Sequence, residues 1–474
     1  MKYTLLYIVL FYSLFNASCV PQKTATNLRE QSLPEKFGKS VVEKPIGHLY
    51  WKEIFTDTLL VQLIDTALAN NYDLKLALQR VEMSKSYVLA AKAKLAPTMD
   101  AAVGTAMRRF GLYTMDGAGN SSTDILPGKR VPTNLPDLFL GVQSSWEIDV
   151  FKKLSNRKKS AIAQMLATTE GANYVKSNIV AQVAILYYQL LAFDNELELL
   201  QLTIKKQEEA LEVILVQKEA GRATELAIQQ FKAQILNTKA MEKEIQQRIV
   251  ETENNLHLLL GQFPRNIKRN KNSLFQSFSL DMNPGLPSQL LENRPDIKEA
   301  TLLVEAANLD IAIAKAAFLP TFNITANLGF QAFRPDLLFL TPTSIAYNAL
   351  SNITTPLLNR QALKANFQLA GNNQVNALYQ YQQKVLNAYI EVSNQLSNLE
   401  NLQKINVLKK EQTELLTNSV ETSTILYRTA RATYLEVLLA QQNALQSNME
   451  LINANMLQKM AKINLYKSLG GGWR

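Results

Sequence analysis

Apolar and polar residues alternate along four stretches of the chain, and this period of two is typical of β-strands. The pattern predicts strands at about 98–110, 138–150, 321–333 and, more weakly, 344–355. The second stretch places six apolar side chains on one face: Leu138, Leu140, Val142, Trp146, Ile148 and Val150. Alternating strands of about ten residues are typical of outer-membrane barrels, and a soluble sandwich remains the alternative. The stretch 116–124, rich in Gly, Asn and Ser, suits a long surface loop.

Long helical patterns fill most of the remaining chain. Between residues 179 and 215 apolar side chains recur about every 3.5 positions without a proline or glycine, which predicts a helix packed along a partner. If it starts near Ser155 and breaks near Gly221, its roughly 65 residues would reach about 100 Å. A return helix follows at 224–260, and the second half of the chain repeats the hairpin with its tip near Ala430. Such hairpins suit a scaffold as well as a pore.

The two halves of the chain are copies of one unit. Residues 73–98 recur 223 positions later without a gap, as the matched pairs Lys92/Lys315 and Pro97/Pro320 show, and Arg222-Ala223-Thr224 matches Arg431-Ala432-Thr433. A period this long makes each copy a structural half with its own strands and helices. We expect a signal peptide at 1–18, an extended lipid-anchored segment at 19–60, a first repeat at 61–265, a linker at 266–285 and a second repeat at 286–474.

The N-terminal residues have the pattern of an export signal. A basic start is followed by an apolar run at 5–15, which is too short to span a membrane, and then by Asn16-Ala17-Ser18-Cys19. This resembles a bacterial lipoprotein signal, except that Asn16 stands where Leu or Val is usual. It predicts cleavage before Cys19 and a covalent lipid on that residue; a plain export signal is the alternative. Because Cys19 is the only cysteine, an internal disulfide is excluded.

Composition excludes several classes of function. The net charge is +9, but the basic residues are mixed with acids and form no tract with aromatics, so no nucleic-acid partner is expected. His48 and His257 are the only histidines, and there is no phosphate loop, paired-cysteine motif or nucleophile elbow. We therefore expect no enzyme activity, no catalytic residue, no metal site and no cofactor apart from the lipid on Cys19.

The strand count predicts an oligomer. Four strands cannot close a barrel, and each unpaired backbone group in lipid would cost several kcal/mol. Two copies would give eight strands and a barrel filled by side chains, so three copies and twelve strands make the smallest open conduit. The predicted fold class is an α+β membrane protein: a homotrimeric 12-stranded outer-membrane barrel continuous with a periplasmic barrel of long α-helices.

Four segments carry a family resemblance: SWEIDVF at 145–151, LENRPDI at 291–297, AKAAFLP at 314–320 and YKSLGGGW at 466–473. They are similar to the signature segments of the TolC-like outer-membrane efflux family, and most similar to those of its lipoprotein (NodT-type) branch. The resemblance implies a passive exit channel for small molecules, anchored in the bacterial outer membrane and extending into the periplasm. It also implies two protein partners: a periplasmic adaptor, and an inner-membrane resistance-nodulation-division pump that supplies the energy.

The resemblance also assigns roles to residues at the hairpin tips. Tyr427, Glu436 and Leu439 match positions at the family's periplasmic aperture, and Glu436 would form an acidic ring in the trimer that favours cations. A second acidic position of some relatives is Leu439 here, which leaves cation selectivity open. Glu436 could equally be an ordinary solvated helix residue.

The tips themselves match the family's adaptor-docking surface. The residues concerned are Gly221, Arg222, Thr224, Arg431 and Thr433. Arg and Thr are also ordinary helix-boundary residues, so a structural role is the alternative. Ala430 stands where the first tip has Gly221, the residue better suited to positive φ. Arg294-Pro295-Asp296 is interpreted as a structural helix start.

Other functions remain as alternatives. A coiled, adhesive or structural envelope lipoprotein would not conduct, and an exit duct for type I secretion would use the same fold. An envelope enzyme would need clustered acid–base residues, and none is visible in the sequence. The exported substrate, the particular pump and adaptor, and the resting state of the aperture are not determined by the sequence.

Overall fold

The computed structural model of the protein describes residues 34, 37, 46–276, 284–356 and 358–474. These residues belong to two compact units. The first holds Met83–Met165 and Leu302–Leu378, and the second holds Leu166–Thr301, Tyr379–Arg474 and the described part of Arg29–Glu82. The predicted signal peptide and Cys19 lie outside the described residues.

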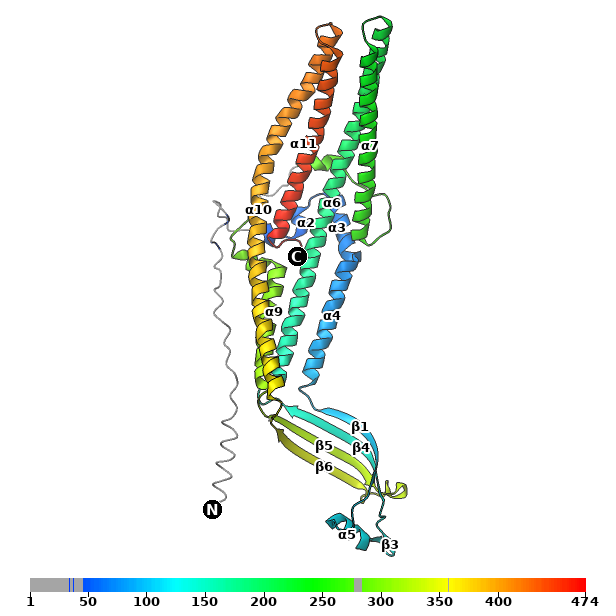
Figure 1. The fold of residues 1–474 in the computed structure, drawn as a ribbon, viewed down its shortest axis with the longest axis vertical. Helices are drawn as coiled ribbons and strands as arrows, with labels where there is room; N and C mark the ends of the chain where they lie inside the picture. Colours follow the sequence, from blue (N-terminus) through cyan, green and yellow to red (C-terminus); the bar gives the residue numbers. More distant parts are fainter. Residues whose placement is uncertain (1–33, 35–36, 38–45, 277–283, 357) are drawn as a thin grey trace. The chain divides into compact units, whose positions relative to one another are not determined.

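In the first unit, four antiparallel strands form one sheet in the order β1-β4-β5-β6 (Figure 1). They are β1 (Thr98–Arg108), β4 (Leu135–Ile148), β5 (Thr321–Ala332) and β6 (Ile345–Thr354). The β4–β5 pairing joins a strand of the first repeat to a strand of the second. Within the described chain β1 and β6 each pair along one edge only, so each leaves a row of backbone groups available to another strand.

The register gives the sheet one apolar and one polar face. Residues paired across strands share a face, and one such row is Val103, Leu140, Phe330 and Ile345. A row on the opposite face is Asp100, Gln143, Asn327 and Asn348. The alternation in the sequence therefore becomes a continuous difference between the two faces of the sheet.

The connection between β1 and β4 contains more structure than the predicted loop at 116–124. It forms helix α5 (Met115–Ser122) and a small pair of strands, β2 (Asp124–Leu126) and β3 (Lys129–Arg130). The Thr114 hydroxyl accepts a hydrogen bond from the Gly117 N–H at 3.1 Å and so caps α5. The expectation of a surface loop did not include this short helix, because side-chain capping stabilises it without apolar periodicity.

Six longer helices account for most of the chain. They are α4 (Tyr72–Ala93), α6 (Lys153–Glu219), α7 (Glu225–Leu260), α9 (Pro295–Ala316), α10 (Arg360–Arg428) and α11 (Tyr434–Ser468). The start of α6 is set by Asp149, whose carboxylate accepts hydrogen bonds from the N–H groups of Leu154 and Ser155 at 2.8 and 2.7 Å. These bonds satisfy donors that a helix leaves unpaired in its first turn.

Residues 46–60, predicted to be extended, instead fold onto the core of the second unit. They form η1 (Ile46–His48), α2 (Trp51–Ile54) and the start of α3 (Thr58–Asn70). Trp51 and Phe55 are each only 1% exposed. The Tyr187 hydroxyl donates to Asp57 at 2.8 Å, which attaches this segment to α6. Tertiary burial therefore decides its structure.

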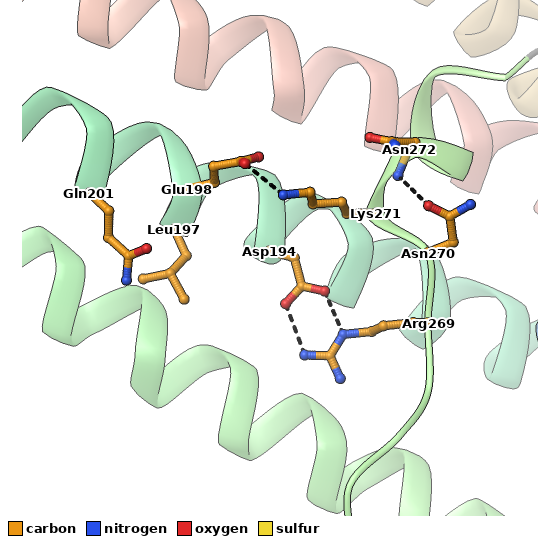
Figure 2. Close-up of a pocket in the computed structure, with 8 residues that line it drawn as sticks. All are labelled: Asp194, Leu197, Glu198, Gln201, Arg269, Asn270, Lys271 and Asn272. Atoms are coloured by element: carbon orange, nitrogen blue, oxygen red, sulfur yellow. Dashed lines mark hydrogen bonds and ion pairs between the residues drawn. The ribbon is translucent and has the colours of Figure 1, made fainter.

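Part of the predicted linker at 266–285 is also built into the second unit. Arg269 donates to both carboxylate oxygens of Asp194 at 2.5 and 2.8 Å and also to Glu253, and η2 (Lys271–Phe275) follows (Figure 2). Lys271 pairs with Glu198 at 2.6 Å. The cavity beside them, about 490 Å³, is lined by charged side chains that are already paired. We therefore interpret these residues as the contacts that hold this segment to α6, and not as a binding site.

The segment Arg294-Pro295-Asp296 joins three parts of the second unit. Pro295 is the first residue of α9, and the buried Arg294 side chain donates to Asp296 at 3.0 and 2.9 Å. The same guanidinium donates to Glu391 on α10 and to the Ser468 carbonyl at the end of α11, both at 2.8 Å. These contacts support the structural interpretation of the segment.

Helix α6 contains a buried carboxyl group, that of Glu196. Glu196 is 7% exposed, and burial raises the pKa of its carboxyl from the ordinary 4.5 to about 7, against the smaller opposing effect of Arg248. The ionised form is therefore disfavoured in the folded protein.

Replacing Glu196 with Gln is expected to stabilise the protein above neutral pH. Because the pKa in the folded protein lies above the unfolded value, ionisation of Glu196 does not reduce the free energy of unfolding below pH 4.5. The reduction grows as pH rises from 4.5 to about 7 and then reaches about 3 kcal/mol. The variant should therefore unfold at a higher temperature than wild type at pH 8 and at a similar temperature at pH 4.5. Glu212→Gln, an exposed change on the same helix, is the control and should show no such pH-dependent difference.

Candidate functional site at the hairpin tips

The first tip joins α6 to α7 by a short loop with a left-handed residue (Figure 1). Gly221 has φ +71°, and the N–H groups of Gly221 and Arg222 donate to the carbonyls of Lys218 and Gln217, both at 2.8 Å. These two hydrogen bonds form a Schellman motif, which satisfies carbonyl groups at the C-terminal end of α6. Thr224 then caps α7, because its hydroxyl accepts from the Ala227 N–H at 3.2 Å.

The second tip, between α10 and α11, repeats this backbone without the glycine. Ala430 has φ +58°, and the Arg431 N–H donates to the Leu426 carbonyl at 2.8 Å. A residue with a Cβ is strained in this conformation by roughly 1 kcal/mol. The second tip therefore adopts the left-handed conformation with alanine where the first tip has glycine.

Glu436 has a structural contact that the first tip lacks. Its Oε2 accepts from the N–H and the hydroxyl of Thr433 at 2.6 and 2.9 Å, the arrangement of a capping box, whereas Ala227 occupies the matching position of the first tip. The hydrogen bond from the Thr433 N–H lowers the pKa of the Glu436 carboxyl below its ordinary value. Glu436 is thus an exposed helix cap, and its role in an acidic ring stays a prediction.

Tyr427 connects the two hairpins. Its side chain is half-buried at the end of α10, and its hydroxyl donates to the Gln217 Oε1 of α6. Burial raises the pKa of Tyr427, which keeps the hydroxyl neutral and able to donate. Gln217 was not among the residues predicted from the sequence, because a partner on another helix leaves no signal in local periodicity.

An apolar cluster lies behind the tips and joins the same two hairpins. It contains Ile214, Ile228 and Phe231 of the first hairpin and Leu438 of the second. Leu439, the predicted aperture residue beside it, is 46% exposed and is not part of this cluster. Behind the tips, Gln442 of α11 also donates to Gln234 of α7 at 2.5 Å. The two hairpins are therefore joined by these hydrogen bonds and a small apolar core, with Leu439 left at the surface.

The predicted docking residues lie at the surface of the two loops. Gly221, Arg222, Thr224, Arg431 and Thr433 are all exposed. Leu226 and Leu435, which occupy matching positions just beyond the two caps, are also exposed, by 57% and 45%. Each tip thus presents an Arg, a Thr and a Leu in the same backbone arrangement.

Two properties of the described residues also concern the class of protein. In the part of the chain that the structure describes, no helix is both long and apolar enough to cross a bilayer. Among the same residues, no group of three or more His, Cys, Asp or Glu side chains is arranged to hold a metal ion.

A sheet with one apolar face and two available edges, together with two long helical hairpins, defines a protomer of an outer-membrane conduit. Residues 63–262 and 286–471 match the sequence profile of the outer membrane efflux protein family, and the chain belongs to that family. The resemblance seen in the sequence is confirmed.

Named relatives cover almost the whole chain. The solvent efflux pump outer membrane protein SrpC of Pseudomonas putida is 30% identical over 431 residues, 89% of this chain and 87% of SrpC. The probable outer membrane lipoprotein SilC of Salmonella typhimurium is 28% identical over 425 residues, 89% of this chain and 88% of SilC. These relatives confirm the predicted outer-membrane localisation.

A solved structure shows the same fold. The open state of the Neisseria gonorrhoeae MtrE outer membrane channel superposes with a TM-score of 0.83 at 22% identity, covering 96% of this chain and 98% of MtrE. The predicted fold class, a tandem-duplicated protomer of a trimeric channel, is confirmed, as is the role of the protein as the outer-membrane channel of an efflux system. The relatives are efflux channels and not enzymes.

Proposed function

We propose that three copies of this chain close a twelve-stranded barrel whose polar face lines a water-filled conduit. The observation that carries this proposal is the sheet of four strands with one apolar face and two available edges. The β6 edge of one copy would pair with the β1 edge of the next, so that no backbone group stays unpaired in lipid. The apolar face would contact lipid and the polar face would contact water. A lipid on Cys19 would add an anchor.

The hairpin tips are proposed to form the aperture and the adaptor-docking surface. Gly221, Arg222, Thr224, Arg431 and Thr433 are exposed at loops of matching geometry, which suits a partner that recognises a repeated motif. That partner would be a periplasmic adaptor working with an inner-membrane resistance-nodulation-division pump. The conduit itself would be passive, with the energy supplied by the pump.

Single-channel conductance of the purified trimer in a planar bilayer tests the conduit. We expect discrete current steps for the wild-type protein under a salt gradient. A protein that inserts but never conducts, even after Tyr427→Phe is introduced to loosen the tips, would contradict the proposal and favour a structural lipoprotein.

Two substitutions at Glu436 separate its charge from its role as a helix cap. Glu436→Gln removes the charge but keeps an oxygen that can accept from the Thr433 N–H, whereas Glu436→Ala removes both. We expect both variants to lower the cation-to-anion permeability ratio, by roughly twofold or more, because three carboxylates would be lost from the aperture. Only the Ala variant should also destabilise the tip, by about 1 kcal/mol.

The pH dependence provides a further check on the same carboxylate. Because the pKa of Glu436 is lowered, its contribution to selectivity should persist as pH falls to about 4.5 and be lost only below that value. Selectivity that is equal in wild type and Glu436→Gln at neutral pH would show that Glu436 acts only as a cap.

A further inference from the structure

A groove in the first unit lies beside the sheet. It has a volume of about 720 Å³ and is lined by residues of α4, α6, α9 and α10. Its charged lining residues are Lys94, Lys153, Arg157 and Asp310. Tyr87 and Leu369 add apolar surface and are 67% and 59% exposed. The groove thus combines cations with accessible apolar side chains.

One ion pair shows on which side of the sheet the groove lies. Lys153 binds Glu147 at 2.5 Å. Glu147 is paired in register with Asn323, and Asn323 with Asn352, so its side chain belongs to the polar face of the sheet. Because Lys153 lines the groove and reaches this face, the groove opens on the polar side. In a closed barrel that side is the lumen.

The carboxylates at the groove already have partners within the protein, but two of its basic side chains do not form ion pairs. Glu147 is occupied by Lys153, and Asp310 accepts a hydrogen bond from Ser160 at 2.8 Å. Among the described residues, Lys94 and Arg157 have no ion-pair partner, and both are exposed. They remain available to an anion from solution, and a guanidinium can hold a carboxylate or sulfonate through two parallel hydrogen bonds.

The wider charge distribution agrees with this local picture. The helical stretches that flank the sheet, at 83–97, 150–165, 302–320 and 355–378, contain eleven Lys and Arg residues and two acidic residues. This excess of nine equals the net charge of the entire chain, +9. The positive charge is therefore concentrated beside the sheet, and the rest of the chain is neutral in sum.

We propose that this groove binds small organic anions with an apolar part as they pass through the conduit, with Lys94 and Arg157 holding the anionic group and Tyr87 and Leu369 contacting the apolar part. The proposal rests on the channel function of the protein. The groove would then select among exported molecules independently of the tips, because it would bind anions whereas Glu436 would favour cations. Three copies of the groove would surround the lumen in the trimer.

Calorimetric titration of the full-length trimer in neutral detergent tests the binding site. The probes are naphthalene-1-sulfonate and, as its uncharged counterpart, naphthalene-1-methanol. We expect the sulfonate to bind more tightly than the alcohol, and a Lys94→Gln/Arg157→Gln variant to weaken sulfonate binding by about tenfold. The control Lys92→Gln/Lys159→Gln removes the same charge from nearby positions that do not line the groove and should change binding by less than twofold. Equal binding of both probes, or equal losses in both variants, would overturn the proposal.

Ion selectivity in planar bilayers tests whether the groove faces the lumen. The Lys94→Gln/Arg157→Gln variant should lower the anion-to-cation permeability ratio by roughly twofold, while the control pair leaves it unchanged. A binding loss without any change in selectivity would overturn the placement in the lumen. If the trimer binds the sulfonate through Lys94 and Arg157 but neither wild type nor Tyr427→Phe conducts, the conduit proposal fails and the binding site stands.

Discussion

Replacing Arg294 with Met is expected to destabilise the protein by about 3–5 kcal/mol, because it leaves two buried or half-buried carboxylates without their partner. Arg294 and Asp296 are 6% and 4% exposed, and the guanidinium also holds Glu391 and the Ser468 carbonyl. The substitution therefore removes the hydrogen bonds that connect the start of α9 to α10 and to the end of α11. For a chain of this length, the thermal midpoint should fall by roughly 4 °C.

The chain contains a matched control for this prediction. Arg334 forms the same two-bond contact with Asp336, two residues later, at 2.9 and 2.7 Å, but their side chains are 42% and 57% exposed. Arg334→Met should cost less than about 1 kcal/mol, because an exposed ion pair contributes little. Differential scanning fluorimetry of the three proteins measures the difference. Equal midpoints for the two variants would show that burial of the Arg294 network does not determine its contribution.

Replacing Tyr427 with Phe is expected to increase the open probability of the aperture. The change removes only the hydroxyl that donates to Gln217 and keeps the aromatic ring. If one such bond contributes about 1 kcal/mol to the closed arrangement, three copies contribute up to about 3 kcal/mol, which corresponds to an increase of up to ~100-fold. Single-channel recording at fixed voltage measures the open probability directly.

A second tyrosine at the same tip provides the control. Tyr434 packs beside the apolar cluster behind the tips, and its hydroxyl makes no hydrogen bond to any described residue. Tyr434→Phe should therefore leave the open probability unchanged. A Tyr427→Phe channel that behaves like wild type would show that the bond to Gln217 does not stabilise the closed state.

Much of the fold could be predicted because its elements have regular periods. Alternation located the strands, with β4 starting at Leu135, a few residues before the predicted 138. The 3.5-residue apolar repeat located α6, and the repeated Arg-Ala-Thr segments located the two hairpin tips. The less regular parts were predicted less well, since α5 depends on capping and residues 46–60 on burial of Trp51 and Phe55.

The sites required information that no single segment contains. The sequence drew attention to Tyr427 and Glu436, but not to Gln217, which lies 210 residues from Tyr427 along the chain. Nor could spacing show that Glu436 caps its own helix while Ala227, its counterpart in the first repeat, does not. The roles of the tip residues in docking and gating stay predictions.

The sequence by itself determined the long helices and barrel strands of this protein, its duplication and the need for more than one copy, because strand and helix periods and the number of strands are local or countable properties. The tertiary structure decided which residues meet: Arg294 with Glu391, Tyr427 with Gln217, and Lys94 with Arg157 in one groove. Contacts between elements that are distant in the chain depend on how apolar faces pack and on strand register, and these are fixed only when the whole core forms.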